Sequence, residues 1–192
     1  GYYKQGLPHL DAIHYVFYGD ENTRVSALQS GDVDMIDYVP WKDSASLESN
    51  ANVQLACTTG PFMALQFNTK FEPFSKPEVR QAIAYAIDRT AVINTAFNGR
   101  GTPLNGVAIP EGYMGYSEQE ANFFSYDPAK AKELLAAAGY PDGFEVRLLS
   151  TAQYGFHENT AVVVQADLAK VGINVKLDLP DWAGRMAKAG TA

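Results

Sequence analysis

The stretch Ser125–Phe144, SYDPAKAKELLAAAGYPDGF, is the most informative part of this sequence. Asp127 can accept hydrogen bonds from the first free amides of a helix, and Pro128 suits the first helical position, where no N–H is needed. Gly139 supplies the left-handed residue that follows a helix. Pro141-Asp142-Gly143 is a turn sequence, and an apolar run begins after it. The stretch therefore predicts a helix, a turn and a strand that starts at Phe144.

A second helix and a second strand are predicted after this first strand. The strand is expected over residues 144–150, the helix from about residue 156 to residue 171, and the next strand over 173–179. This β-α-β spacing favours a parallel pair of strands joined by a right-handed crossover. Asp181 is then expected to cap a last helix that begins at Trp182.

The residues before this region divide into two kinds of pattern. A capping box at Ser75–Glu78 predicts the start of one helix, and Asp88 is predicted to cap the next. Earlier in the chain, a short helix capped by Asn22 or Thr23 is expected among runs of alternating hydrophobicity. Those runs predict strands over residues 11–18, 33–39, 53–58 and 62–67. The change of pattern near residues 60–61 predicts a domain boundary there.

Composition and charge exclude several classes of function. The 192 residues carry a net charge of −7 and no basic run, which argues against a nucleic-acid surface. The longest apolar runs are too short to cross a bilayer. Cys57 is the only cysteine, so no internal disulfide can form, and we expect it buried in the strand over 53–58. His9, His14 and His157 are far apart and form no metal-binding motif, so neither a metal nor a cofactor is expected.

Several short blocks, in order along the chain, resemble one family. They are Gly31–Met35 (GDVDM), Phe67–Thr69 (FNT), Pro73-Phe74, Val79–Ala82 (VRQA), Ala84–Arg89 (AYAIDR), Thr102-Pro103, Ile109-Pro110, Gly172-Ile173 and Asp181-Trp182. Together with the opening stretch they resemble the extracellular solute-binding proteins, family 5, of bacterial ABC transporters, which include oligopeptide, dipeptide and nickel binders. The resemblance covers nearly the whole chain.

The resemblance implies an α/β, periplasmic-binding-protein-like two-lobe fold of type II, of which this chain is mainly the second lobe. Residues 1–59 resemble the last part of the first lobe, 60–68 a strand that crosses at the hinge, and 69–192 an incomplete second lobe. The family's proteins are considerably longer, so the sequence is interpreted as a fragment. We expect a periplasmic or lipid-anchored location.

The function implied is non-covalent capture of a solute between two lobes and delivery to the permease subunits of an ABC importer. A peptide-like solute is expected first, and a nickel complex, an opine or an oligosaccharide stays open. No catalytic residue is implied. Two other classes also stay open: a fragment of an α/β hydrolase or transferase, for which no nucleophile motif is found, and a sensor or interaction module of the same fold.

Five residues are candidates for contact with the solute. The family's equivalent of Trp182 contributes an indole that faces the cleft, although a core tryptophan is an equal alternative. Met63, Leu65 and Gln66 lie in the predicted hinge strand, whose alternate residues should face the cleft. Tyr113 lies in a long loop and is expected either to form a wall of the pocket or to pack against its own lobe.

Overall fold

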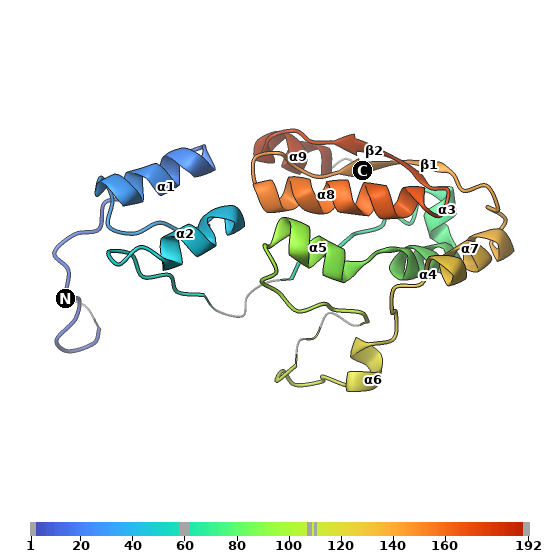
Figure 1. Ribbon diagram of the computed structural model, residues 1–192, viewed down its shortest axis with the longest axis horizontal. Coiled ribbons are helices and arrows are strands. Elements are labelled where there is room, and N and C mark those ends of the chain that lie inside the picture. Colours follow the sequence, from blue (N-terminus) through green and yellow to red (C-terminus); the bar gives the residue numbers. More distant parts are fainter. Residues whose placement is uncertain (1–2, 58–61, 107–108, 110, 190–192) are drawn as a thin grey trace. The chain divides into compact units, whose positions relative to one another are not determined.

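The computed structural model describes residues 3–57, 62–106, 109 and 111–189 (Figure 1). Its internal contacts divide the chain into two units, Gly1–Tyr38 and Val39–Ala192. Each unit is described by itself below. The lobe boundaries implied by the resemblance, at residues 59 and 68, stay a prediction.

The first unit is built around helix α1 (Glu21–Ser30). The helix begins after Asp20, whose carboxylate accepts a hydrogen bond from the backbone N–H of Thr23 at 2.8 Å. The cap is therefore Asp20 and not Asn22 or Thr23, because the backbone of Asp20 is extended and its side chain reaches the first free amide. Gly31 ends the helix in the left-handed region, with φ 80°. Arg24 donates to the carbonyl oxygens of Tyr18 at 3.3 Å and Tyr38 at 2.9 Å.

The strands predicted over residues 11–18, 33–39, 53–58 and 62–67 are not strands in the part of the chain that the structure describes. Residues 58–61 lie outside the described residues. Alternating hydrophobicity shows only that a segment can pair, whereas a strand exists once a partner satisfies its backbone groups. No such ladder forms here, and Tyr15 and Phe17 are 79% and 93% exposed. Cys57, expected to be buried, is likewise exposed, because the segment around it packs against no second strand.

The second unit has ten helical segments and two strands among its described residues, and these come in chain order. They are η1 (Trp41–Asp43), α2 (Ser44–Glu48), α3 (Glu72–Ser75), α4 (Pro77–Ala86), α5 (Arg89–Ala96), α6 (Glu118–Ala121), α7 (Pro128–Ala137), β1 (Glu145–Leu149), α8 (Gly155–Ala169), β2 (Asn174–Asp178) and α9 (Trp182–Ala189), where η1 is a single 3₁₀ turn and α3 and α6 are short.

The helix, turn and strand predicted from residues 125–144 are confirmed. The Asp127 carboxylate accepts from the N–H of Lys130 at 2.9 Å, and Pro128 is the first residue of α7. Gly139 follows the helix with φ 94°. Gly143, with φ 74°, passes so close to the next loop that a Cβ there would lie 2.0 Å from the carbonyl oxygen of Gly172. Glycine is required at position 143 on both grounds.

The start of α4 differs from the prediction. Ser75 ends the short helix α3, and its hydroxyl donates to the carbonyl oxygen of Glu72 at 2.7 Å instead of capping the next helix. Helix α4 begins at Pro77, after Lys76, which makes no side-chain capping bond. Pro73 and Pro77 each suit a first turn, so two helices form in succession. Asp88 does cap α5, because its carboxylate accepts from the N–H groups of Thr90 and Ala91 at 2.9 and 3.1 Å.

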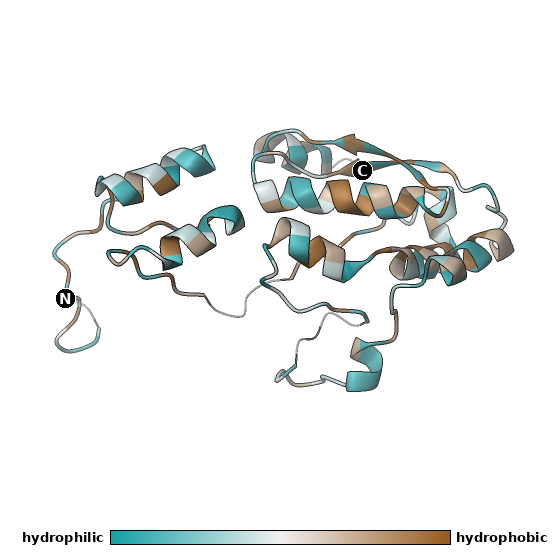
Figure 2. Cartoon of the chain, in the orientation of Figure 1, coloured by the Kyte–Doolittle hydropathy of each residue, from teal (hydrophilic) through white to brown (hydrophobic). Residues whose placement is uncertain are grey.

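Strands β1 and β2 form the predicted parallel pair, with Glu145 opposite Asn174 and Leu149 opposite Asp178. Helix α8 connects them and lies between the sheet and α5 (Figure 1). Hydrophobic residues concentrate on α8 and the strands, whereas α6 is hydrophilic (Figure 2). The side chains at the centre of the core are those of Val79, Ile83, Leu135 and Ile173.

Candidate functional site

Two loops meet at the carboxyl edge of the parallel sheet. Residues 150–154 follow β1 and lead into α8, and residues 179–181 follow β2 and lead into α9. In open α/β sheets this edge is where ligands bind, because loops and helix N-termini converge there without obstructing the strands. The positive ends of the two helix dipoles also favour acidic groups at this edge. The sheet topology therefore selects this edge as the candidate site.

Trp182, the first residue of α9, is the central side chain at this edge. Its backbone N–H donates to the Oε1 atom of Gln153 at 2.9 Å, which ties the two loops together. Asp181 accepts from the N–H of Gly184 at 2.8 Å and so caps α9 as predicted. The Trp182 side chain is 38% exposed, and the edges of Tyr154 and His157 contact it, with ring centroids 5.7 and 5.9 Å away. One face of the indole therefore rests on protein while part of the ring stays open to solvent.

Arg185 lies one helical turn beyond Trp182. Its guanidinium carbon is 4.9 Å from the centroid of the Trp182 ring, a distance at which the cation and the ring attract each other. Burial, together with the charge of Arg185, lowers the pKa of His157, so this imidazole is neutral near pH 7. We call the four side chains Tyr154, His157, Trp182 and Arg185 the Trp182 cluster. It combines an aromatic surface with one positive charge.

A row of aromatic rings extends from this cluster across the ends of the helices. His157 stacks at 4.5 Å on Phe156, Phe156 lies 5.9 Å from Phe97 at the end of α5, and Phe97 lies 5.7 Å from Trp41. These pairs have the tilted or edge-to-face geometry that stabilises aromatic contacts. The 3₁₀ turn η1 is thereby joined to the same edge of the second unit as α9.

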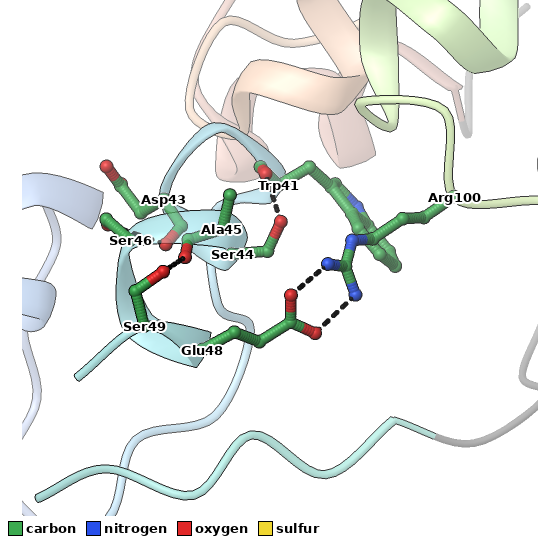
Figure 3. A network of polar contacts seen from close by, with 8 residues as sticks. All are labelled: Trp41, Asp43, Ser44, Ala45, Ser46, Glu48, Ser49 and Arg100. Carbon is green, nitrogen blue, oxygen red and sulfur yellow. Dashed lines mark hydrogen bonds and ion pairs between the residues drawn. The ribbon is translucent and has the colours of Figure 1, made fainter. Parts of the chain in front are cut away.

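An ion pair holds the Trp41 segment in place. Arg100, just after α5, donates two parallel hydrogen bonds to the carboxylate of Glu48 at the end of α2, one of them 2.8 Å long (Figure 3). The hydrogen bonds from Arg100 keep the pKa of Glu48 below its usual range. The hydroxyl of Ser44 donates to the carbonyl oxygen of Trp41 at 2.7 Å, which fixes the turn locally.

The other predicted contact residues do not join the Trp182 cluster. Leu65 packs against the hydrophobic core, and with Gln66 it borders a small, mainly apolar pocket of about 50 Å³ beside β1. Met63 and Tyr113 are both exposed. Among the described residues, no ring contact or hydrogen bond links any of these four to Trp182. Their contact with a solute stays a prediction.

Sequence reasoning missed Tyr154, His157 and Arg185 as members of the site. The available signal was position: Tyr154 and His157 lie at the junction between the first predicted strand and the helix after it, and Arg185 follows Trp182 by three residues, which places both on one helix face. Within the described residues, no group of three His, Cys, Asp or Glu side chains is arranged to hold a metal ion. No helix in this part of the chain has the length and apolarity needed to cross a membrane.

Comparison with known proteins places this architecture in a family. The family described as bacterial extracellular solute-binding proteins, family 5 Middle, matches residues 1–191. The glutathione-binding protein GsiB of Salmonella typhi is 37% identical over 189 residues, which cover 98% of this chain and 36% of GsiB. This chain therefore spans little more than a third of the length of the curated relatives it matches.

Solved structures give the same fold. The periplasmic binding protein AgaA of A. tumefaciens R10, in complex with agropinic acid, is 70% identical with a TM-score of 0.93, and the match covers 99% of this chain and 39% of AgaA. DppA of Helicobacter pylori, in complex with the peptide STSA, is 30% identical with a TM-score of 0.79 and coverages of 89% and 33%. The fold is the α/β type II fold of periplasmic binding proteins. The chain belongs to family 5 of the bacterial extracellular solute-binding proteins.

Proposed function

We propose that this chain is part of the solute receptor of a bacterial ABC importer and that the solute is an opine of the agropinic acid type. The observation that carries the proposal is the 70% identity to AgaA, whose structure contains agropinic acid, over 99% of this chain. At this identity the residues that face a ligand are commonly retained within a fold. MoaA, in complex with mannopinic acid, is 29% identical and supports the same class of solute.

The chemistry of the candidate site supports the proposal. An acidic, polyhydroxylated or amide-containing solute needs a flat apolar surface for its carbon skeleton and a few polar groups for orientation. The Trp182 cluster offers an indole, a phenol, a neutral imidazole and a guanidinium at one sheet edge. No reaction is part of this function: the solute is bound, enclosed by closure of two lobes, and released to the permease. The receptor would act in the periplasm or on the outer side of the cell membrane.

The lobe assignment is part of the same proposal. Residues 1–59 would complete a first lobe, residues 60–68 would cross at the hinge, and residues 69–192 would form most of the second lobe. The exposed apolar side chains of Tyr15 and Phe17 support this assignment, because an extended segment of this kind buries its faces only when other strands flank it. Met63 would then lie near the start of the crossing segment.

A peptide solute is the second candidate. GsiB is named as a glutathione-binding protein, and DppA was solved with a tetrapeptide, at 37% and 30% identity to this chain. Both identities are far below that to AgaA, and we therefore place the opine first.

Calorimetric titration of the whole receptor, meaning the full protein that contains these residues, tests the proposal. Agropinic acid, mannopinic acid, glutathione and the peptide STSA are titrated in turn. We expect agropinic acid to bind at least about tenfold more tightly than either peptide, a difference of about 1.4 kcal/mol. Tight binding of a peptide with no heat from agropinic acid would transfer the proposal to the second candidate.

A further inference from the structure

Arg185 differs from the other arginines of the chain in having no hydrogen-bond acceptor. The sequence contains six arginines. Five of them donate to carbonyl or carboxylate oxygens: Arg24, Arg80, Arg89, Arg100 and Arg147. The side chain of Arg185 is half-buried, and its Nε atom is enclosed without an acceptor among the described residues. An enclosed donor without an acceptor costs free energy, which a suitable partner would recover.

Nearby acidic groups are engaged elsewhere. Asp181 caps α9 through the N–H of Gly184, at 2.8 Å. Asp178 pairs with Lys188 at 2.6 Å and with Arg147 at 3.5 Å. His157, which also faces Arg185, is neutral near pH 7 and cannot offset its charge. The guanidinium therefore keeps an uncompensated positive charge at the carboxyl edge of the sheet.

The Trp182 ring holds this charge in a defined position. The guanidinium stacks at 4.9 Å over the indole, which restricts the orientation of its donors. A planar guanidinium prefers a carboxylate, because two parallel N–H groups match its two oxygens. The indole beside it can cover the carbon atoms next to such a group.

We propose that Arg185 binds the carboxylate of the captured solute and that Trp182 covers the adjacent part of the solute. This inference rests on the proposed function and deepens it, because it assigns the recognition of the acid group to one residue. A carboxylate could reach Arg185 from two sources: the solute, or an acidic side chain of the receptor beyond the described residues. We assign it to the solute, since the guanidinium lies beside a partly open indole at the edge where ligands bind.

The test uses the whole receptor and three variants: Arg185→Gln, Arg185→Lys and Lys130→Gln. Lys130→Gln removes the same charge from the exposed face of α7, where Lys130 pairs only with Glu133 at 3.3 Å, and serves as the matched control. Affinity for agropinic acid is measured by calorimetry at low and high salt, and the melting temperature of each ligand-free protein is measured in parallel.

We expect Arg185→Gln to weaken agropinic acid binding by at least about thirtyfold and to remove most of its salt dependence. Arg185→Lys should lose less, because a point charge replaces the fork. Lys130→Gln should bind within about twofold of the wild type. The melting temperature of ligand-free Arg185→Gln should stay close to that of the wild type.

Binding of agropinic acid by Arg185→Gln within about threefold of the wild type would overturn the inference and leave the proposed function standing. Unchanged affinity with a lowered melting temperature would assign the carboxylate to the receptor itself and would also overturn it. If the wild type binds STSA instead of agropinic acid, the proposed opine fails, and the peptide is compared with its C-terminal amide. Equal affinity for acid and amide overturns the inference, whereas a loss for the amide that Arg185→Gln abolishes supports it. A wild type that binds none of the probes overturns both proposals.

Discussion

The backbone N–H of Trp182 donates to the side-chain oxygen of Gln153 at 2.9 Å, although 29 residues separate them in the chain. This bond joins the loop after β1 to the first turn of α9, and it places the indole against Tyr154 and His157. The position of Trp182 is therefore set by a neighbouring loop as well as by its own helix.

Replacing Gln153 should release this connection. We expect Gln153→Ala to lower the free energy of unfolding by about 1 kcal/mol, the usual net value of one hydrogen bond, and to weaken solute binding as the indole loses its fixed position. Gln119→Ala, on the exposed helix α6, is the control and should change neither. Denaturant unfolding and calorimetry measure the two effects. Unchanged affinity in Gln153→Ala would show that the bond does not position the site.

Trp182 itself should matter more for binding than for stability. Because its side chain is 38% exposed, Trp182→Ala removes less buried surface than a core truncation, which would cost about 3–5 kcal/mol. We expect a stability loss below about 2 kcal/mol and a loss of about 1–3 kcal/mol in solute affinity. Thermal melting and titration of the same variant separate the two roles. A stability loss in the core range with unchanged affinity would make the tryptophan structural.

Gly143 should tolerate no side chain. A Cβ at this position meets the carbonyl oxygen of Gly172 at 2.0 Å, and φ is 74°. Gly139 has a similar φ of 94° but no atom within 4 Å of the added Cβ. Gly139→Ala should therefore cost only the conformational strain, about 1–2 kcal/mol. Gly143→Ala should cost clearly more in urea unfolding, and equal losses would contradict the close approach of the two loops.

The pair Glu48–Arg100 makes stability depend on pH in the acidic range. Hydrogen bonds from Arg100 lower the pKa of Glu48 from its ordinary value of 4.5. A lowered folded-state pKa means that the unfolded chain binds the proton more readily. The contribution is thus complete above pH 4.5 and is lost as the pH falls through the folded pKa. Melting temperatures of wild type and Glu48→Gln should converge below that range, and raised salt should reduce their difference at pH 7. A constant difference at all pH values would contradict the ion pair.

His157 should act in the opposite direction from an ion-paired histidine. Burial and the nearby Arg185 lower its pKa from 6.5, so the unfolded chain gains a proton first as the pH falls. The free energy of unfolding should therefore decrease below about pH 6.5. His157→Gln should remove this part of the pH dependence, and His14→Gln, at an exposed position, serves as the control. An unchanged profile in His157→Gln would show that another group is responsible.

The fold was predictable from sequence where local signals agreed with one another. At Asp127, Pro128 and Gly139 a cap, a first-turn proline and a left-handed residue specify the same helix, and the structure follows them. The segment over residues 11–18 has the pattern of a strand without the pairing, because pairing depends on residues distant in the chain. The Trp182 cluster is likewise a product of tertiary contact. Trp182 could be singled out by resemblance, but the unpaired state of Arg185 is visible only once its surroundings are known.

The position of the bound solute tests the central claim most directly, namely that the carboxyl edge of the parallel sheet is the binding site. The measurement is a crystal structure of the whole receptor with agropinic acid. We predict the acid group within about 3.2 Å of the Arg185 guanidinium nitrogens, with solute carbon atoms in contact with the Trp182 ring. A solute bound with neither Trp182 nor Arg185 in contact would contradict the account.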